Sequence, residues 1–556
     1  MASGSKPGDD TSAKRYNDIL SIIDKRLVPD EGAKRARGEV FTPLKLVREM
    51  ILGLRKSAVE KGHNEIWGFD EEEDTFRDDD ETDRLGGIPL SVLRDPTMTW
   101  LDPANGIGNF PVVVFYILDY QLGKHGSREL KGDGNKTKRR KHIVEKMLYM
   151  IELNKGNVNT SRKIFQKLAP GAKSNICCAD TLKMTDIKLK REFGFDRFDV
   201  VMGNPPFNNN LEANPSGHAQ DTGLWEEFVT KSIDVFLKKS TGLLAFLHPA
   251  RWRQPDHSLH AIMFSKQFLF LAIFNKQEGD KQFNAVTRFD YYILQNRESK
   301  EKVPVKFEDN SMASIYINNK TPFISNFGYD IWENIMNANI DTLDVLGGGS
   351  AIKYSKADHA IEDECPKGKP FLNVNTTAKT DRVPKGATYR KTRKQSNTER
   401  SSDNKIYVDM VCSSKEHPLK NKKKVIFSKN EVVYPFYDDG TYGLTSNAFC
   451  ILVSNKTEGD IIVKYLNSTL LKFLIASVKF GNFSTAKNIF DYIPNPLLFD
   501  RTYSDKNMYA IFKFNKEQIR QITGHTIELE ENENTEEEAP VHKKAAKSGK
   551  TRRLSR

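Results

Sequence analysis

The segment Asn204-Pro205-Pro206-Phe207 combines residue types that could do chemistry on a base. It follows the apolar run Phe198–Gly203, which is typical of a buried parallel strand that ends at a loop. Open α/β sheets bind ligands outside the carboxyl ends of their strands. The segment offers an amide that can donate and accept, prolyl carbonyls without N–H groups, and an aromatic face. That set suits a flat base with an amino group; an ordinary proline-rich turn is the alternative.

A second segment, Asp102 to Phe110, has the pattern of a strand end, a glycine-rich turn and a helix start. Gly106 and Gly108 allow the backbone to approach a ligand closely, and a helix N-terminus offers free N–H groups. The pattern Gly-x-Gly-x-x-Gly is absent because residue 111 is proline, and no lysine follows to make a phosphate loop. A nucleoside without a pyrophosphate is therefore favoured over NAD or ATP, and a tight turn without a ligand is the alternative.

Two acids follow the next two apolar runs. Glu152 could accept hydrogen bonds from both ribose hydroxyls, and Asp180 could accept one from an adenine amino group. An acid at a strand end can also serve only as a helix cap. Two such acids after a glycine-rich turn nevertheless indicate a nucleoside site.

The elements that must position these residues begin near residue 98, where apolar runs alternate with helical or polar stretches. The alternation predicts an α/β fold with a doubly wound, mostly parallel sheet. The last runs are closer together and could supply an antiparallel edge. We expect strands at Thr99–Leu101, Leu148–Ile151, Asn175–Cys178, Phe198–Met202, Gly242–Leu247, Leu269–Phe274 and Phe289–Leu294.

The rest of the sequence sets the expected domain boundaries. A helix is expected over Tyr16–Leu27, and the basic insert Lys136–Lys141 is either a solvated loop or a phosphate-contacting one. Four parts are expected: a disordered N-terminus (1–15), a catalytic domain (16–305), a second domain (310–515), and a disordered tail (528–556) that is acidic and then basic.

The net charge is +11, from 85 basic and 74 acidic residues, and fits a nucleic-acid partner better than an acidic small molecule. The five cysteines show no zinc or redox spacing, so we expect no metal and a reducing, intracellular compartment. No apolar run reaches about 18 residues, and the N-terminus has no apolar signal core. The chain is therefore expected to be soluble, with no membrane partner, and cytoplasmic if bacterial or nuclear if its basic tail directs it there.

Taken with the segment Gly38–Pro43, these motifs resemble, in their order, the gamma-group N6-adenine DNA methyltransferases of restriction–modification systems. The segment Leu247–Trp252 is similar to a further strand-end segment of that group, and the resemblance covers about residues 16–300. Asn105 and Ile107 depart from the Cys and Ser of the usual Asp-Pro-Ala-Cys-Gly-Ser-Gly. Both flank the glycines, so the resemblance to a cofactor loop holds.

The resemblance implies a Rossmann-like methyltransferase domain, a C-terminal α+β DNA-recognition domain, S-adenosylmethionine as cofactor and double-stranded DNA as partner. It implies that Phe41, Thr42 and Pro43 help close the methionine end of the cofactor. Asp102 and the backbone of 104–108 would hold its amino-acid portion, Glu152 its ribose and Asp180 its adenine. The implied cofactor-binding set is Phe41, Thr42, Pro43, Asp102, Pro103, Ala104, Gly106, Gly108, Phe110, Glu152 and Asp180.

The implied target-base set is Asn204, Pro205, Pro206 and Phe207. Asn204 and the Pro205 carbonyl would accept hydrogen bonds from the target N6 amino group, Pro206 would fix the turn, and Phe207 would stack on the base. The lone pair of this nitrogen is delocalised into the ring, and two hydrogen-bond acceptors favour its rehybridisation. Alignment of the nitrogen with the cofactor methyl group then permits direct in-line transfer. Because this nitrogen is inaccessible in the duplex, the base must be flipped out.

Several alternatives stay open at this point. One is methylation of a protein glutamine, since that class of enzyme also uses Asn-Pro-Pro-aromatic; others are a bifunctional restriction enzyme and a catalytically silent scaffold. A separate cognate endonuclease is a further candidate partner. The segments Lys385–Lys394 and Lys479–Lys487 either contact DNA or are surface loops.

Overall fold

The computed structural model describes residues 42–207, 223–347, 416–429, 435–444, 448–481, 486–499 and 503–524, with the backbone of three short strands at 371–375, 390–391 and 409–413. Phe41, the helix expected over Tyr16–Leu27 and the termini 1–15 and 528–556 lie outside the described residues. So does Lys385–Lys394, apart from the backbone of β16 (Arg390–Lys391).

The chain divides into two compact units. The first unit runs to Tyr329 and also includes Val478–Ile489. The second unit consists of Asp330–Ser477 and the chain from Phe490 onward. The first unit carries the segments expected to bind the cofactor and the target base, whereas Lys385–Lys394 belongs to the second unit.

A nine-stranded sheet forms the centre of the first unit, in the order β13-β12-β10-β11-β9-β8-β5-β6-β7. The run from β9 through β8, β5 and β6 to β7 is parallel. Its strands are β5 (Trp100–Asp102), β6 (Leu148–Glu152), β7 (Asn175–Cys178), β8 (Val200–Gly203), β9 (Leu243–Pro249), β10 (Lys266–Phe274), β11 (Phe289–Glu298), β12 (Val303–Lys306) and β13 (Met312–Ile315). The predicted α/β fold is confirmed, and each of the seven expected strands overlaps an observed one.

The predicted antiparallel edge is wrong in its position. β11 is antiparallel to its neighbours, but it lies between β9 and β10 inside the sheet. Its residues Phe289–Leu294 are all buried, and a strand that apolar is covered on both faces. The sheet ends instead at β12 and β13, which pair antiparallel with each other.

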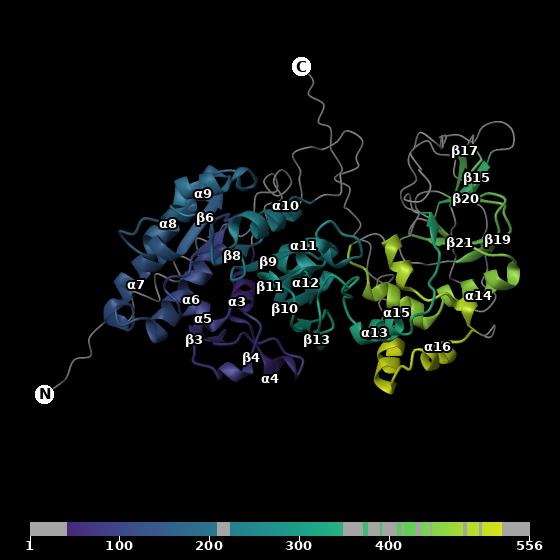
Figure 1. Ribbon diagram of the computed structural model, residues 1–556, viewed down its shortest axis with the longest axis horizontal. Coiled ribbons are helices and arrows are strands. Elements are labelled where there is room, and N and C mark those ends of the chain that lie inside the picture. Colours follow the sequence, from purple (N-terminus) through teal and green to yellow (C-terminus); the bar gives the residue numbers. More distant parts are fainter. Residues whose placement is uncertain are drawn as a thin grey trace, which may run out of the picture. The chain divides into compact units, whose positions relative to one another are not determined.

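Helices cover both faces of this sheet (Figure 1). Successive strand residues alternate between two cores, as the two-residue repeat of a strand requires: Trp100 packs in one core and Leu101 in the other. The first core takes residues from α3 and α6, and the second takes residues from α9 and α10. The helices are α3 (Leu44–Leu52), α4 (Lys56–Val59), α5 (Leu90–Leu93), α6 (Asn109–His125), α7 (Lys136–His142), α8 (Lys155–Leu168), α9 (Asp186–Phe193), α10 (Leu224–Lys231), α11 (His260–Phe264) and α12 (Lys276–Phe283).

The strand order reverses between β5 and β8. From β5 the chain proceeds outward to β6 and β7, and it then crosses to β8 on the other side of β5. In open α/β sheets such a switch point, at the carboxyl ends of the strands, is where ligands bind. β5 ends at Asp102 and β8 at Gly203, so the two key segments leave the sheet side by side.

The basic insert forms the helix α7, so the expected loop is wrong. The Nε of Arg139 lies 2.6 Å from Asp119 Oδ1, and the Nε of Arg140 lies 2.7 Å from Asp119 Oδ2. Asp119 belongs to α6 and is buried. These two arginines therefore hold α7 against α6, and such buried charges need their partner.

The second unit combines helices with two four-stranded sheets. One sheet has the order β14-β21-β18-β19 and the other β16-β17-β15-β20. A buried ion pair between Lys424 and Asp438 joins neighbouring strands of the first of these sheets. The expected α+β class of the C-terminal region is confirmed. The strands are β14 (Leu346–Gly347), β15 (Phe371–Asn375), β17 (Asp409–Ser413), β18 (Lys424–Ser428), β19 (Phe436–Asp438), β20 (Gly443–Leu444) and β21 (Ala448–Leu452), and the helices include α14 (Lys456–Leu466), α15 (Thr469–Ser477) and α16 (Asp505–Ile511).

Among the described helices, none is both long and apolar enough to span a membrane.

Candidate functional site

The Asn-Pro-Pro-Phe segment leaves β8 at the switch point. Pro205 is buried, whereas Asn204, Pro206 and Phe207 are partly exposed. The centre of the Phe207 ring lies 6.3 Å from that of Phe283, with the ring planes at 77°. This edge-to-face contact holds the Phe207 ring through its packing with α12. Phe283 is a site residue that the sequence patterns did not reveal, because it follows Phe207 by 76 positions.

Asp102 ends β5 next to that segment and is only 1% exposed. Its Oδ1 accepts a hydrogen bond of 3.0 Å from the Ala104 amide. Burial of the carboxyl, and then the nearby charge of Glu152, raise the pKa of Asp102 to about 8. A buried acid with such a pKa is one that a cationic ligand would convert to its carboxylate.

Gly203 is what brings β8 so close to Asp102. Its φ of 154° disfavours a side chain, and a Cβ at this position would lie 2.9 Å from Asp102 Oδ1. The glycine therefore permits close approach between the glycine-rich loop that begins at Asp102 and the Asn-Pro-Pro-Phe segment. Gly203 directly precedes Asn204 in the sequence, and this position could have indicated its role, but the sequence analysis did not single it out.

The glycine-rich loop is joined to the end of β6 through Glu152. The Gly106 amide donates to Glu152 Oε2 at 2.7 Å, and the Asn154 amide donates to Oε1 at 2.6 Å. The loop needs its glycines, since φ is 54° at Gly106 and 104° at Gly108. The structure thus brings Asp102, the glycines and Glu152 together.

Two buried asparagines give this loop an excess of acceptors. Asn105 donates through Nδ2 to Ser161 Oγ at 3.2 Å and to Gly106 O at 3.0 Å, and Asn109 donates through Nδ2 to Thr42 O at 2.9 Å. Within the described part of the chain, the Oδ1 atoms of both asparagines are buried and accept no hydrogen bond. Together with the Asp102 carboxyl, these oxygens make the loop electronegative, which suits a cationic group better than a phosphate.

Asp180 lies at the carboxyl end of β7 and caps the short helix η4 (Thr181–Lys183). Its Oδ1 accepts from the Leu182 amide at 3.1 Å, and its Oδ2 lies 3.1 Å from Lys183 Nζ. The pair is exposed enough for solvent to weaken it, so the carboxylate can exchange partners. The Thr181 hydroxyl donates to the carbonyl of Pro103, which ties this strand end to the glycine loop.

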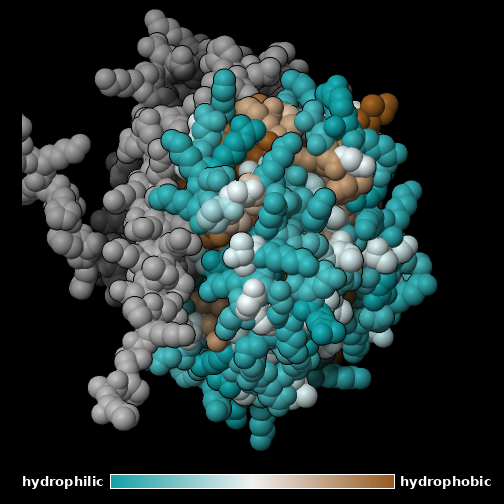
Figure 2. All heavy atoms as spheres, turned by 90° about the vertical axis from the view of Figure 1, so that its left-hand side faces the viewer, coloured by the Kyte–Doolittle hydropathy of each residue, from teal (hydrophilic) through white to brown (hydrophobic). Residues whose placement is uncertain are grey.

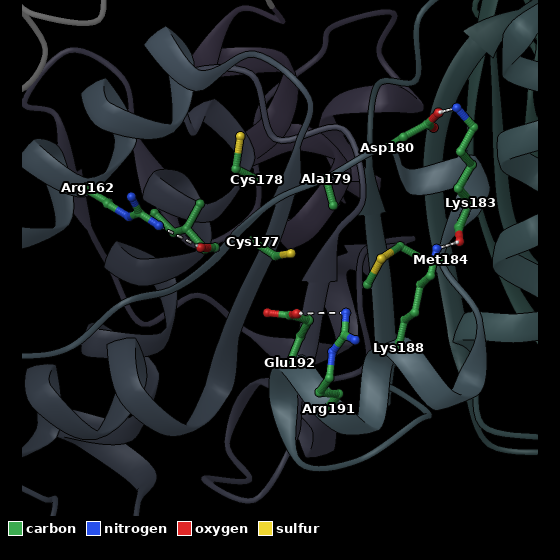
Figure 3. Close-up of a pocket in the computed structure, with 11 residues that line it drawn as sticks. Arg162, Cys177, Cys178, Ala179, Asp180, Lys183, Met184, Lys188, Arg191 and Glu192 are labelled. Atoms are coloured by element: carbon green, nitrogen blue, oxygen red, sulfur yellow. Dashed lines mark hydrogen bonds and ion pairs between the residues drawn. The ribbon is translucent and has the colours of Figure 1, made fainter.

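A cavity of about 420 Å³ opens beside β7, with Asp180 among its lining residues (Figure 3). Arg162 closes one end by donating to the Ile176 carbonyl at 3.1 Å. Lys188 donates to the carbonyl of Lys183 at 2.9 Å. The cavity therefore lies beside β7, the edge strand of the sheet, and includes Asp180 at the carboxyl end of that strand.

Leu153 is a further residue that the sequence did not single out. It directly follows Glu152 and is 66% exposed. Among the described residues of the first unit, the exposed large apolar side chains are Leu153, Ile187, Val286 and Tyr316. Figure 2 shows one face of the molecule as mainly hydrophilic, with limited apolar areas. The carboxyl end of β6 is therefore followed by an exposed leucine, which offers an apolar surface to a flat ring.

The segment Leu247–Trp252 serves as a buried support. His248 stacks on Trp225 with ring centres 4.4 Å apart, and burial lowers the pKa of His248 to about 3, so the imidazole is neutral. Trp252 Nε1 donates to Asp290 Oδ2 at 2.8 Å, and Arg253 Nε donates to the same oxygen at 2.7 Å. These contacts fix the carboxyl end of β9, the neighbour of β8.

Comparison with known proteins gives a family for part of the first unit. Residues 134–283 match the model of the family described as Eco57I restriction-modification methylase. The chain is also 22% identical over 409 residues to an uncharacterized adenine-specific methylase of Mycoplasma pneumoniae, covering 57% of this chain and 82% of that protein.

Two solved structures are similar at lower levels. The type IIL restriction-modification enzyme MmeI, in complex with DNA, is 12% identical with a TM-score of 0.46, covering 87% of this chain and 71% of that one. A modification subunit of a putative type I restriction enzyme from Vibrio vulnificus is 16% identical with a TM-score of 0.33, covering 64% of each chain. Neither similarity assigns an activity to this chain.

The family match includes Glu152, Asp180 and Asn204–Phe207, and the glycine loop precedes it. The resemblance drawn from the motifs is therefore confirmed. Residues 134–283 of this chain are therefore similar to the Eco57I restriction-modification methylases.

Proposed function

We propose that the protein transfers a methyl group from S-adenosylmethionine to the N6 amino group of adenine in DNA. The observation that carries this assignment is the close approach of β8 to β5 at Gly203 and Asp102. This approach puts the Asn204–Phe207 segment directly beside the acidic, glycine-rich loop, and that segment would hold an amino-bearing base. The Eco57I family match and the adenine-specific methylase relative support the same activity.

The residues present fit S-adenosylmethionine. Its amino-acid end carries an ammonium group, and the buried oxygens of Asp102, Asn105 and Asn109 favour positive charge there. Its nucleoside end has partners on the next strands, with Glu152 for the ribose and Asp180 for the adenine. The exposed side chain of Leu153 lies between these two acids in sequence and suits one face of that adenine. When bound, the cofactor supplies an activated sulfonium methyl group.

The target base is proposed to lie against Asn204, Pro205 and Phe207. The Asn204 amide oxygen and the Pro205 carbonyl would accept from the N6 amino group and draw its lone pair out of the ring. Phe207 would stack on the base, held from its edge by Phe283. The chain's contribution is then alignment of the base with the methyl donor, in a position that a flipped nucleotide can reach.

Double-stranded DNA is the proposed partner, and the second unit is proposed to read its sequence. Residues 134–283, in the first unit, match a family of restriction-modification methylases, and this match supports DNA as the substrate. A protein glutamine is the alternative substrate, because its side-chain amide would meet the same two acceptors.

The test is methylation-aware sequencing of duplex DNA incubated with the protein and S-adenosylmethionine. N6-methyladenine at one recurring sequence is expected. In Asn204→Ala the modification should be lost while S-adenosylmethionine binding stays within about threefold of the parent, a difference below one kcal/mol. A glutamine peptide that accepts the methyl group while DNA does not would overturn the assignment, and metal-dependent cleavage of unmethylated DNA would add a nuclease activity.

A further inference from the structure

A buried hydrogen bond links two segments that lie 67 positions apart. Asn109 is the first residue of α6, and its Nδ2 donates to the carbonyl of Thr42 at 2.9 Å. Asn109 is 5% exposed and Thr42 is 3% exposed. Because water cannot replace a bond between two buried groups, its loss leaves both unsatisfied.

The same bond fixes where the Thr42-Pro43 segment lies. Pro43 caps the N-terminus of α3, and Thr42, the first described residue of the chain, directly precedes it. Further along α3, Glu49 Oε1 accepts from the Tyr291 hydroxyl at 2.9 Å, which anchors the body of the helix to β11. The body of α3 thus has its own anchor, whereas the Asn109 amide holds the residues in front of the helix.

The position of Asn109 shows which end of the site is affected. It follows Gly108, and the Gly108 amide donates to the Asn105 carbonyl at 2.9 Å. The loop of Asp102 and the two asparagines belongs to β5 and α6, whereas the proposed ribose and adenine partners end β6 and β7. Thr42 therefore lies on the amino-acid side of the cofactor site and away from the nucleoside side.

We propose that Asn109 is a positioning residue that holds Thr42 and Pro43 against the glycine loop and thereby sets the affinity for the amino-acid end of the cofactor. The inference rests on the proposed function, since it takes S-adenosylmethionine as the ligand. Asn109 acts through Thr42. Its own unsatisfied Oδ1 adds to the negative potential of the loop.

The test compares two ligands, of which only the first has that end. S-adenosylmethionine has the amino-acid portion, and 5′-deoxy-5′-methylthioadenosine has the nucleoside and a thioether without it. In Asn109→Ala the dissociation constant for S-adenosylmethionine should rise about tenfold, as expected for one lost buried hydrogen bond. The dissociation constant for methylthioadenosine should stay within about twofold.

A second variant separates the donor from the fold. Asn109→Leu keeps the branched shape and the size of the side chain but offers neither a donor nor an acceptor. The Thr42 carbonyl then loses its partner without a cavity, so S-adenosylmethionine binding should weaken at least as much as in Asn109→Ala, while methylthioadenosine binding stays within about twofold. A leucine variant that binds both ligands as the parent does would show that the donor has no positioning role.

Asn175→Ala is the matched control. The Nδ2 of Asn175, at the opposite end of β7, donates to the carbonyls of Val144, Glu145 and Leu148 at 3.0–3.2 Å. Its removal should lower the melting temperature without changing the ratio of the two dissociation constants. Equal weakening of both ligands in Asn109→Ala would overturn the inference as general damage. A parent protein that does not bind S-adenosylmethionine would instead overturn the proposed function.

Discussion

At Asp102 a carboxyl group is buried where the fold gives it one backbone donor and a nearby acid. Such surroundings favour the protonated form, and the group becomes an effective partner for a cation only by losing its proton. The cost of that ionisation is met when a positive charge arrives. The residue is thereby suited to a cationic ligand and poorly suited to an anionic one.

Cofactor binding should therefore depend on pH through Asp102. Its pKa in the ligand-free protein is about 8, and a bound ammonium group would lower it. Below pH 8, binding then releases a proton, and the dissociation constant for S-adenosylmethionine should fall about tenfold for each pH unit up to about pH 8. Calorimetry in buffers of different ionisation enthalpy measures the released proton directly. A dissociation constant that is flat from pH 6 to 8 would contradict the role.

Asp102→Asn is the control, and it should bind the cofactor weakly at every pH.

The same pKa predicts how the stability of the folded protein depends on pH. The folded-state pKa of Asp102, about 8, is above the ordinary value of 3.8, so unfolding releases a proton between about pH 4 and 8. This group's contribution to stability therefore falls as the pH rises through that window. The melting temperature of the asparagine variant should exceed that of the parent most clearly near pH 8.

At the scale of elements, the site depends on how closely β8 approaches β5. The contact is made by backbone at Gly203 and by side chain at Asp102. A methyl group on Gly203 would meet the Asp102 oxygen at 2.9 Å and would need a backbone φ that side chains disfavour. The site is therefore sensitive to one carbon atom at the end of a strand.

Gly203→Ala should weaken S-adenosylmethionine binding by at least tenfold, because Asp102 or the start of the Asn-Pro-Pro-Phe segment must shift. Equilibrium binding measures this loss. Gly194→Ala is the matched control: Gly194 also has a positive φ, 87°, but a Cβ there would meet nothing within 4 Å. Both variants carry backbone strain, so equal cofactor affinities in the two would show that the contact with Asp102 does not matter.

The strands could be predicted from the sequence because each is a local apolar run bounded by turn residues, and the motifs mark where the parallel ones end. The place of β11 could not, since it depends on pairing with β9 and β10, which is not local. For the same reason the sequence did not reveal Phe283 or Asn109: each acts through a contact with a residue far away in the chain. Gly203 and Leu153 are adjacent to recognised motifs in the sequence, but their roles depend on the residues around them in the structure. Gly203 permits close approach because it has no side chain, and Leu153 exposes an apolar one.

At the scale of the whole molecule, the first unit includes a segment that follows most of the second unit's residues in the sequence. Residues Val478–Ile489 belong to the first unit. The carbonyl of Lys479 accepts from Asn326 Nδ2 at 3.0 Å, and the Phe480 ring lies 5.2 Å from the guanidinium carbon of Arg253. Arg253 also holds Asp290, next to the end of β9. A chain that ended at Tyr329 would leave the buried Asn326 Nδ2 without the Lys479 carbonyl and the Arg253 guanidinium without the covering Phe480 ring, so it should fold poorly.

Phe480→Ala tests this dependence within the full chain. Phe480 is 4% exposed, so truncation of its ring should lower the free energy of unfolding by ~3 kcal/mol through the cavity and the lost cation–π contact. Leu498→Ala removes an apolar side chain that is 56% exposed and should change stability by no more than about 0.5 kcal/mol. Denaturant unfolding compares the two. If both variants unfold at the same midpoint, the returning segment does not support the first unit, and a chain ending at Tyr329 should then keep its stability.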